Sequence, residues 1–565
     1  MTSALSNAWS RSDRIGKWVI ALLFALVIAN IFFVFFGHPE QGDDSWNHFN
    51  WLGQFTKLYA GGLAYPRWMS ASNGGFGSAT FYFYPPLIYF IAAWVNELFR
   101  GLTPYQLYQI LQVAGSILSG LAFYLFVSRV GLRGWQGIAA SILYTCIDYR
   151  ADDIYLRSAL GEHWGFVWVP IVLLSLIYSF ESGGGKERGF RILLLSAIAW
   201  AGILLTSIPT AIVVGAACGG LLLVRRRELS VLRVAAWILG AILGVALAAF
   251  YILPVFHFRP LVHLNHLWDV FPFKLPDFML LRIFSHDVKT FHIRRVLMLF
   301  AACGIGWWLL RSLHRSNVSA VKRLMTQLAL VCCALAIFFQ LPYISSPLWD
   351  YFPGLSTVQF TWRWDILLVV AFALSYAALQ HTEFQKRINW TLIGLIVITL
   401  IAGIRISLSR SDYGGTVHRE HFDSPEWAPI YTKPVRQNQE AYMVAHQNDV
   451  PITLLNPNVG DSALLLKSGP SERKYSVQLA KPTEAKFHMY YWPQWKLRNG
   501  EAEIAAMPDT AGVMTAQLPA GKYELELRLE RSESEIAGVN ISLGASILFV
   551  LLALVGFMQS RKRIA

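Results

Sequence analysis

The sequence has little charge, and it has no cysteine in its long polar segments. Charged residues make up 15% of the 565 residues, whereas soluble domains carry about 25%, and the mean hydropathy is +0.42. These values indicate a polytopic membrane protein and exclude an ordinary soluble domain. The five cysteines lie in or beside apolar runs, which excludes a disulfide framework, and no Cys/His spacing fits a zinc site.

The apolar runs have no charged residue in their central thirds. Twelve of them are candidates to cross a bilayer, for which a helix needs about 20 apolar residues. They are 17–36, 105–128, 134–148, 161–180, 190–206, 208–224, 232–252, 296–311, 324–341, 362–380, 388–405 and 538–559. Ion-coupled carriers usually need an ionisable group inside the membrane, so this absence counts against a transporter.

A further apolar run, 82–99, is better explained as a helix at the outer membrane surface. If it does not cross, every short Lys/Arg cluster falls on one side, as the positive-inside rule requires. Both termini are then cytoplasmic, and the outer segments are 37–104, 148–160, 253–295 and 342–361. The net charge of +13 arises from these clusters, so it does not indicate a nucleic-acid partner.

The polar segment 406–537 predicts a small extracytoplasmic β-domain. Its second half contains short runs separated by turn signals such as Arg498-Asn499-Gly500. The expected strands are 476–480, 486–492, 496–498, 501–506, 512–518 and 523–529. Residues 538–565 then form the last membrane-spanning helix, which tethers the β-domain, and a basic cytoplasmic tail.

The ionisable residues gather on the predicted outer segments. Asp43 and Asp44 follow the first apolar run, and His48 shares a helix face with Asp44. Asp152 and Asp153 stand in the next outer segment. Catalytic carboxylates often lie on loops above a rigid scaffold, so both pairs are candidates for a site, with helix capping as the alternative for each. The other candidates are Arg67, for which an interfacial anchor is the alternative, and Tyr84, Arg157, Glu162, His163 and Arg363.

At these residues the chain resembles the membrane glycosyltransferases of the GT-C superfamily. The matching pattern is an acid in the first outer loop, an aromatic-Pro-Pro-Leu start to a surface helix at 84–87, and an acid in the second outer loop. More narrowly, the chain is similar to a bacterial membrane family labelled pyruvoyl-tetrahydropterin-synthase-related. The stretches that carry this similarity are 44–48, 65–68, 83–86, 153–157 with Glu162, 360–364 and 490–495. The label suggests pterin chemistry, but the sequence has no zinc–histidine triad.

The resemblance implies a GT-C-like transmembrane module over residues 1–405 and an inverting sugar transfer at the outer face of the bacterial cytoplasmic membrane. The implied donor is a polyprenyl-phosphate sugar, and the acceptor is a glycan or lipid of the envelope. Carried over, the general base is Asp44, with Asp43 as the fallback and Asp153 as the second-loop acid. Some relatives use a divalent cation such as Mg or Mn, for which Asp44, Asp153 and Glu162 are the candidate ligands.

The remaining candidates are expected to bind substrate. They are His48, Arg67, Tyr84, Asp152, Arg157, Glu162, His163 and Arg363. Two other functions stay open from the sequence: a lipid or glycan flippase, and a non-catalytic membrane protein whose β-domain binds envelope glycan. The sequence does not identify the sugar or the acceptor.

Overall fold

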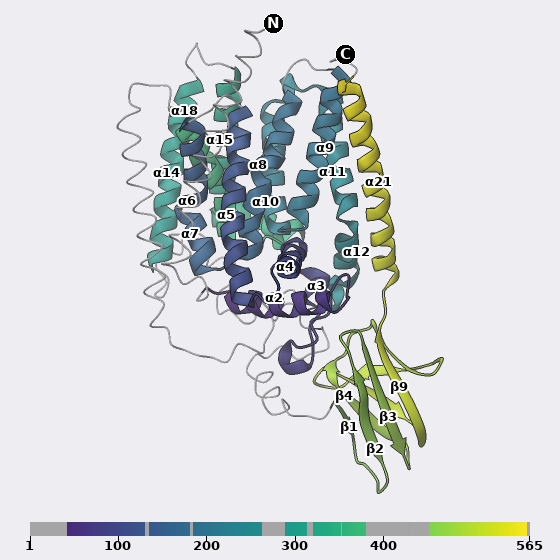
Figure 1. The fold of residues 1–565 in the computed structure, drawn as a ribbon. Helices are drawn as coiled ribbons and strands as arrows, with labels where there is room; N and C mark the ends of the chain where they lie inside the picture. Colours follow the sequence, from purple (N-terminus) through teal and green to yellow (C-terminus); the bar gives the residue numbers. More distant parts are fainter. Residues whose placement is uncertain are drawn as a thin grey trace.

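The computed structural model describes residues 42–129, 135–180, 185–262, 289–313, 320–351, 353–379, 429 and 451–561. These residues form a bundle of upright helices, with short helices across its lower end and a β-sandwich below (Figure 1). The expected apolar runs 17–36 and 388–405 lie outside the described residues, as do residues 263–288 of the third outer segment and most of 406–450.

The upright helices differ in length and in how deeply they are buried. They are α5 (Pro104–Arg129), α6 (Trp135–Cys146), α8 (Leu160–Phe180), α9 (Gly185–Leu204), α10 (Ile208–Val224), α11 (Val231–Leu247), α12 (Ala249–Phe258), α14 (Lys289–Leu313), α15 (Ala320–Gln340), α18 (Asp365–Leu379) and α21 (Glu533–Arg561). By length and composition, α5, α8, α15 and α21 can each cross a membrane, and α11 with α12 forms one further span bent by 70°.

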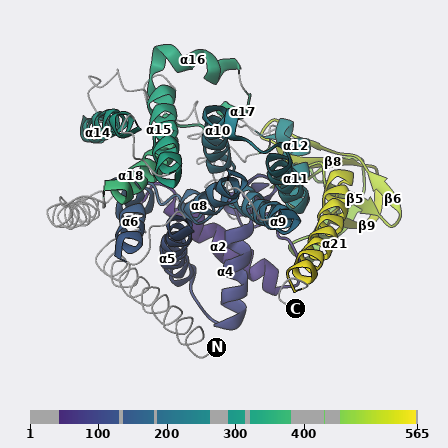
Figure 2. The same cartoon turned by 90° about the horizontal axis from the view of Figure 1, so that it is seen from above.

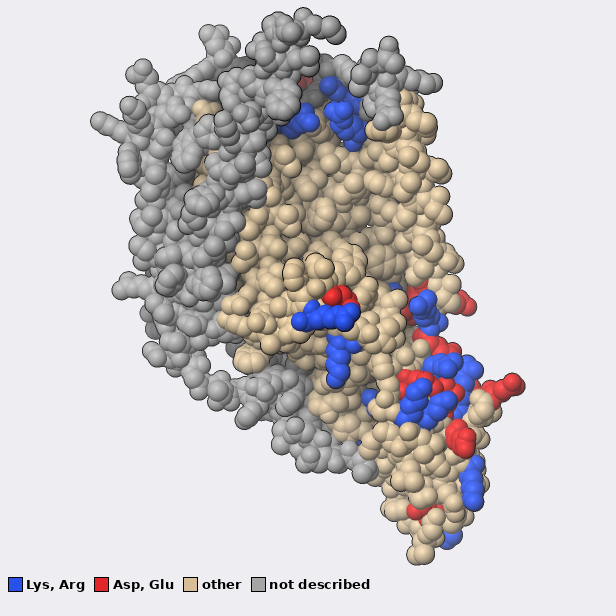
Figure 3. Space-filling view, viewed as in Figure 1, with Lys and Arg blue, Asp and Glu red and all other residues tan. Residues whose placement is uncertain are grey.

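The expected twelve spans are therefore not all found among the described residues. One reason is length: α6 has 12 residues and α18 has 15, so α6 is about 18 Å long against a hydrocarbon core of about 30 Å. On the face shown in Figure 3, the described Lys and Arg side chains gather toward the two ends, and a broad uncharged band lies between them. This distribution is the one that a membrane-embedded bundle requires.

Helix α8 is the central helix of the bundle. Its sequence is apolar on every face after Glu162 and His163, which predicts a helix surrounded by others. Seen from above, α5, α6, α9 and α10 lie around it (Figure 2). Of the residues in the most apolar stretch of α8, 78% are buried, whereas the share is 11% in the corresponding stretch of α21 at the periphery. The first turn of α8 therefore lies inside the protein and not in lipid.

The first outer segment folds across the lower end of the bundle. It contains α2 (Ser45–Ala60), α3 (Thr80–Phe83) and α4 (Leu87–Leu98). Helix α4 lies across the bundle axis in both views, which is the arrangement expected for run 82–99 (Figures 1 and 2). Pro85 and Pro86 explain where α4 begins, because proline suits the start of a helix and disfavours its interior.

The β-sandwich consists of two antiparallel sheets with the orders β1-β4-β8-β7 and β2-β3-β9-β5-β6. The strands are β1 (Ile452–Leu454), β2 (Ser462–Ser468), β3 (Glu472–Leu479), β4 (Thr483–Tyr490), β5 (Trp495–Asn499), β6 (Ala502–Ile504), β7 (Ala506–Pro508), β8 (Val513–Leu518) and β9 (Gly521–Leu529). Five of the six expected strands are present, whereas the expected strand 501–506 is divided between β6 and β7, which lie in different sheets. Strands β1 and β2 were not predicted. In β4 buried and half-buried residues alternate, as a strand with one face in the core requires.

The sandwich is more than a module tethered by α21. Side chains of the first outer segment share a buried cluster with its core, including Trp68, Phe76 and Tyr82. Other short elements at the lower end complete the fold. They are α7 (Asp148–Ala151), the π-helical turn η3 (Asp152–Leu156), α16 (Pro342–Tyr351), α17 (Pro353–Ser356) and the 3-10 turn η8 (Thr361–Trp364).

Candidate functional site

The second outer segment reaches α8 through an unusual turn. Residues Asp152–Leu156 form a π-helical turn, closed by hydrogen bonds of 2.9 Å from Arg157 N to Asp152 O and 3.0 Å from Ala159 N to Asp153 O. Ser158 follows with φ 53°, a left-handed conformation that costs a non-glycine residue about 1–3 kcal/mol. Single π-helical turns occur often at functional sites.

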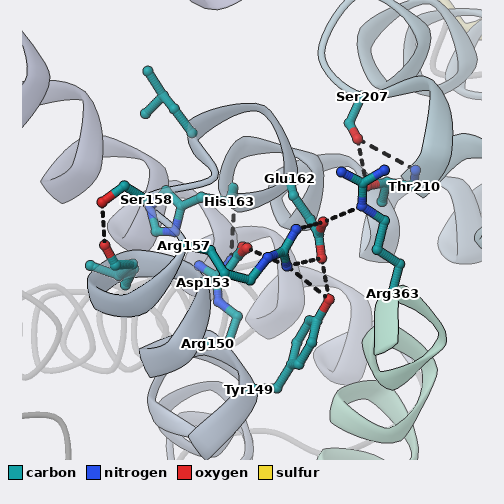
Figure 4. A network of polar contacts seen from close by, with 12 residues as sticks. Tyr149, Arg150, Asp153, Arg157, Ser158, Glu162, His163, Ser207, Thr210 and Arg363 are labelled. Atoms are coloured by element: carbon teal, nitrogen blue, oxygen red, sulfur yellow. Dashed lines mark hydrogen bonds and ion pairs between the residues drawn. The ribbon is translucent and has the colours of Figure 1, made fainter. Parts of the chain in front are cut away.

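Glu162 is the centre of a buried charge network in the first turn of α8. Its Oε2 accepts a bond of 2.9 Å from Arg157 Nη2 and one of 3.1 Å from Arg363 Nε. Its Oε1 accepts a bond of 3.2 Å from Arg157 Nη1 and a short one from the Tyr149 hydroxyl. Figure 4 shows Arg157 and Arg363 on either side of this one carboxylate. Two arginines from distant parts of the chain are thus held together by Glu162.

Asp153 completes the network from the π-helical turn. Its side chain is fully buried, and Oδ1 accepts a bond of 3.1 Å from Arg157 Nη1. Oδ2 has no hydrogen-bond partner among the described residues. Burial raises the pKa of Asp153, and the neighbouring Glu162 raises it further. Asp153 therefore holds its proton to a higher pH than a free aspartic acid does, although it contacts Arg157.

The first outer segment meets this turn at Asp44. The Asp44 N–H donates a hydrogen bond of 2.9 Å to the Arg157 carbonyl, and Ser45 Oγ lies 3.4 Å from Ser158 Oγ. Gly42 packs so closely on Ser158 that a Cβ there would lie 1.9 Å from its Oγ. The acidic stretches of the first and second outer segments therefore lie next to each other, although more than a hundred residues separate them.

Neither acidic pair caps a helix. Asp44 occupies the N-cap position of α2, but its side chain accepts no capping hydrogen bond from that helix. The N-cap of the π-helical turn is Ala151, and Asp152 and Asp153 lie inside the turn. Asp43 and Asp44 are exposed, whereas Asp152 is 8% exposed and Asp153 is buried. The structure therefore does not support helix capping as the role of Asp44, Asp152 or Asp153.

Tyr84 contacts both α2 of the first outer segment and the start of α8. Its ring packs on Trp51 with a centroid distance of 4.8 Å, and its hydroxyl lies so close to Gly161 that a Cβ there would be 3.0 Å away. Burial raises the pKa of Tyr84, Asp44 raises it further, and Arg363 lowers it. Tyr84 is thus within electrostatic reach of both Asp44 and Arg363, as expected of a site residue.

His48 belongs to the interior and not to the open site. It is 1% exposed, its Nδ1 lies 2.7 Å from the Tyr89 hydroxyl, and its Nε2 accepts a bond of 3.4 Å from the Leu160 N–H. Burial lowers the pKa of His48 to about 3, so the imidazole is neutral with its proton on Nδ1. Both ring nitrogens are engaged by the protein, which leaves none to bind a substrate.

Arg67 and His163 also contact parts of the protein other than this network. Arg67 Nε pairs with Glu535 at 2.9 Å, and its Nη2 donates a bond of 2.8 Å to the Phe250 carbonyl. His163 is buried, and its Nε2 lies 2.9 Å from the Gln112 carbonyl of α5. Neither side chain joins Glu162, so the structure does not bring them to the predicted site.

Two residues that were not among the predicted site residues belong to the site. Tyr149 bonds Glu162 and accepts a bond of 3.3 Å from Arg157 Nη1. Arg150 is fully buried below Asp153 and donates to the His163 carbonyl and to Ser119 Oγ at 3.1 and 3.2 Å. The sequence signal that could have identified them is their position in the same short outer segment as Asp152 and Asp153.

The proposed cation ligands do not form a metal centre. Among the residues that the structure describes, no three His, Cys, Asp or Glu side chains group to hold a metal ion. Both oxygens of Glu162 already accept hydrogen bonds from arginine and tyrosine. The donor set Asp44, Asp153 and Glu162 therefore does not fit a divalent cation, which needs several converging oxygens.

The fold and site define a membrane protein with a buried carboxylate–arginine network where two outer loops meet at one end of a helical bundle. The chain belongs to the family described as "6-pyruvoyl-tetrahydropterin synthase related domain; membrane protein", which matches residues 81–411. This confirms the family to which the sequence was compared. No curated protein matches the chain.

The solved structures that are similar to the chain include two of the arabinofuranosyltransferase AftD from Mycobacteria. The first has a TM-score of 0.42 and 15% identity, and the match covers 70% of this chain and 27% of that one. The second, a mutant form, has a TM-score of 0.41 and 14% identity, with 76% and 30% covered. The chain thus spans less than a third of the length of either.

Proposed function

We propose that this protein transfers a sugar from a polyprenyl-phosphate donor to a glycan or lipid acceptor of the cell envelope. The reaction takes place at the outer face of the bacterial cytoplasmic membrane, with both termini in the cytoplasm, and it inverts the anomeric centre. The observation that carries the proposal is the main-chain hydrogen bond from the Asp44 N–H to the Arg157 carbonyl, which holds the loop with an exposed carboxylate next to the turn that carries one arginine of the network.

The donor phosphate binds at Arg157 and Arg363. Their bonds to Glu162 leave Nε of Arg157 and Nη2 of Arg363 without a hydrogen bond among the described residues. With Arg150, three guanidinium groups lie near the two carboxylates of Asp153 and Glu162, and this excess of positive charge favours an anion. Arg67 has no part in this binding, because Glu535 and the Phe250 carbonyl hold it apart from Glu162, and its remaining nitrogen, Nη1, is buried.

Asp44 is the general base, and Asp43 is the fallback. Asp44 takes the proton of an acceptor hydroxyl while that oxygen forms a bond to the anomeric carbon of the sugar. The bond from this carbon to the phosphate oxygen breaks, and its electron pair leaves with the phosphate. Attack from the face opposite the phosphate inverts the centre. The leaving phosphate is a stable anion held by two arginines, so the step needs no general acid.

The experiment is a transfer assay with purified protein in nanodiscs, a synthetic polyprenyl-phosphate sugar and an envelope extract as acceptor. We expect a glycosylated product of inverted configuration by NMR, and a donor KM raised about tenfold or more by Arg363→Gln. The matched control is Arg498→Gln, since Arg498 is a half-exposed arginine paired with Glu530 in the sandwich. Movement of the lipid across the bilayer without loss of its sugar would contradict the proposal and favour a flippase.

A further inference from the structure

Three aromatic stretches meet in one buried cluster. From the first outer segment come Trp68, Tyr82 and Phe83, and from the sandwich come Tyr490, Trp492 and Trp495. Trp492 is fully buried, with ring centroids at 5.3 Å from Tyr82, 5.4 Å from Phe258 and 6.2 Å from Trp68. The core of the sandwich is thus continuous with the outer loop of the bundle.

A glycine-rich turn docks against strand β4 through its main chain. The Tyr490 N–H donates a bond of 2.7 Å to the Phe76 carbonyl, and His488 Nε2 lies 3.2 Å from the Gly74 carbonyl. The His488 ring packs on Phe76 with a centroid distance of 4.0 Å. Gly77 has φ 85°, and a Cβ there would lie 2.4 Å from Trp68. The turn therefore has one fixed shape that fits the sandwich.

The docked segment leads directly to the site. Tyr82 packs on Trp492, the Phe83 carbonyl accepts a hydrogen bond from the Tyr251 hydroxyl, and Tyr84 is the next residue. The Tyr65 hydroxyl donates a bond of 2.8 Å to the Phe81 carbonyl. Tyr84, which packs on Trp51 and at the first turn of α8, therefore follows directly after Phe83 of the aromatic cluster.

A buried ion pair fixes the other end of the same segment. Arg67 and Glu535 are 8% and 3% exposed, and Glu535 lies in the first turn of α21, just after the last strand of the sandwich. The guanidinium of Arg67 stacks over Tyr65 at 4.0 Å. Because removal of one partner would leave a buried charge, this pair resists separation of the sandwich from the loop.

We propose that the β-sandwich is a positioning element of the site, which fixes residues 65–84 and thereby holds Tyr84 against Trp51 and the first turn of α8, next to Glu162. The inference rests on the proposed function. It assigns to the sandwich a part in turnover, whereas a tethered glycan-binding module would act on acceptor binding alone. Residue His488 acts through the loop and is a positioning residue, since it does not reach the network around Glu162.

The test uses the full chain in nanodiscs with His488→Ala. This half-buried side chain lies outside the core of the sandwich, so the variant keeps the fold, whereas Trp492→Ala would remove a core residue. The matched control is Leu464→Ala on strand β2, where Leu464 is 62% exposed. The measurements are hydrogen exchange of residues 65–84, kcat, and the donor and acceptor KM values.

We expect His488→Ala to speed exchange in residues 65–84 and to lower kcat about tenfold with an unchanged donor KM, because misplacement of a site group slows the chemical step. Leu464→Ala should match the wild type in each measurement. Phe76→Ala, which removes the ring below His488, should repeat the effect. Unchanged exchange, or a change in acceptor KM alone, would overturn the inference. A wild-type protein without transfer would instead overturn the proposed function.

Discussion

Replacing Glu162 with glutamine removes the one carboxylate that holds Arg157 and Arg363 together. Glu162 accepts bonds from both arginines and from Tyr149, and its side chain is 3% exposed. The substitution keeps the size of the side chain but leaves the buried guanidinium of Arg157 and the half-buried one of Arg363 without the carboxylate that they share. Removing one partner of a buried ion pair costs about 3–5 kcal/mol, and we expect the free energy of unfolding to fall by that amount.

The assay is chemical unfolding in nanodiscs, with a surface pair as the matched control. Glu503 pairs with Lys496 at 3.1 Å, and Glu503 is 53% exposed, so Glu503→Gln should cost about 0.2–1 kcal/mol. In a double-mutant cycle, Glu162→Gln and Arg363→Gln should show a coupling of about 0.5–3 kcal/mol. A loss from Glu162→Gln no larger than that from Glu503→Gln would refute the network as a stabilising element.

The remaining predictions concern residues around the network. His48 has a pKa of about 3 in the folded protein and about 6.5 when unfolded, so its contribution to stability is complete above pH 6.5 and falls as the pH drops toward 3, by about 1.4 kcal/mol per pH unit. His48→Gln should flatten this dependence in unfolding titrations, and an unchanged slope would contradict the assignment. Gly77→Ala should destabilise the protein more than Gly62→Ala, because both glycines have positive φ but only at Gly77 would the new Cβ meet Trp68. Equal losses of stability in thermal unfolding would count against the packed turn. Arg67→Met should lower stability in the same assay and leave the donor KM unchanged, and a raised donor KM would return Arg67 to the phosphate site.

The strands of the sandwich were predictable because their signal is local. In β4, a buried residue alternates with a half-buried one over Thr483–Tyr490, and the Arg498-Asn499-Gly500 turn after β5 has a glycine with positive φ. The start of α4 was equally local, since Pro85 and Pro86 mark it. Strands β1 and β2 were missed because both are edge strands. Strand β2 also has a register shift and little burial.

The roles of the arginines were not predictable, because they depend on which distant side chain lies opposite. Arg67 and Arg363 looked equivalent in the sequence, since each has aromatic neighbours and lies in an outer segment or at the outer end of an apolar run. In the structure Arg67 pairs with Glu535 of the last helix, whereas Arg363 joins Glu162. Packing of the whole chain decides these pairs, and no local pattern encodes it.

The same holds for His48 and for the turn at Asp153. Helical spacing correctly put His48 on α2 near Asp44, but burial by Tyr89 and the start of α8 turned its ring inward. The π-helical turn and the positive φ of Ser158 are irregular backbone states without a periodic signature. They are nevertheless what places Asp153 and Arg157 beside the loop that carries Asp44.

The most direct test of the central claim is the turnover of Asp44→Asn in the transfer assay, with Asp43→Asn as the matched control. The account predicts that kcat falls about 10²- to 10⁴-fold for Asp44→Asn, which corresponds to about 3–5 kcal/mol in the barrier, and that Asp43→Asn stays within about tenfold of the wild type. Full turnover by Asp44→Asn would contradict it, and a large loss in Asp43→Asn alone would move the base to Asp43.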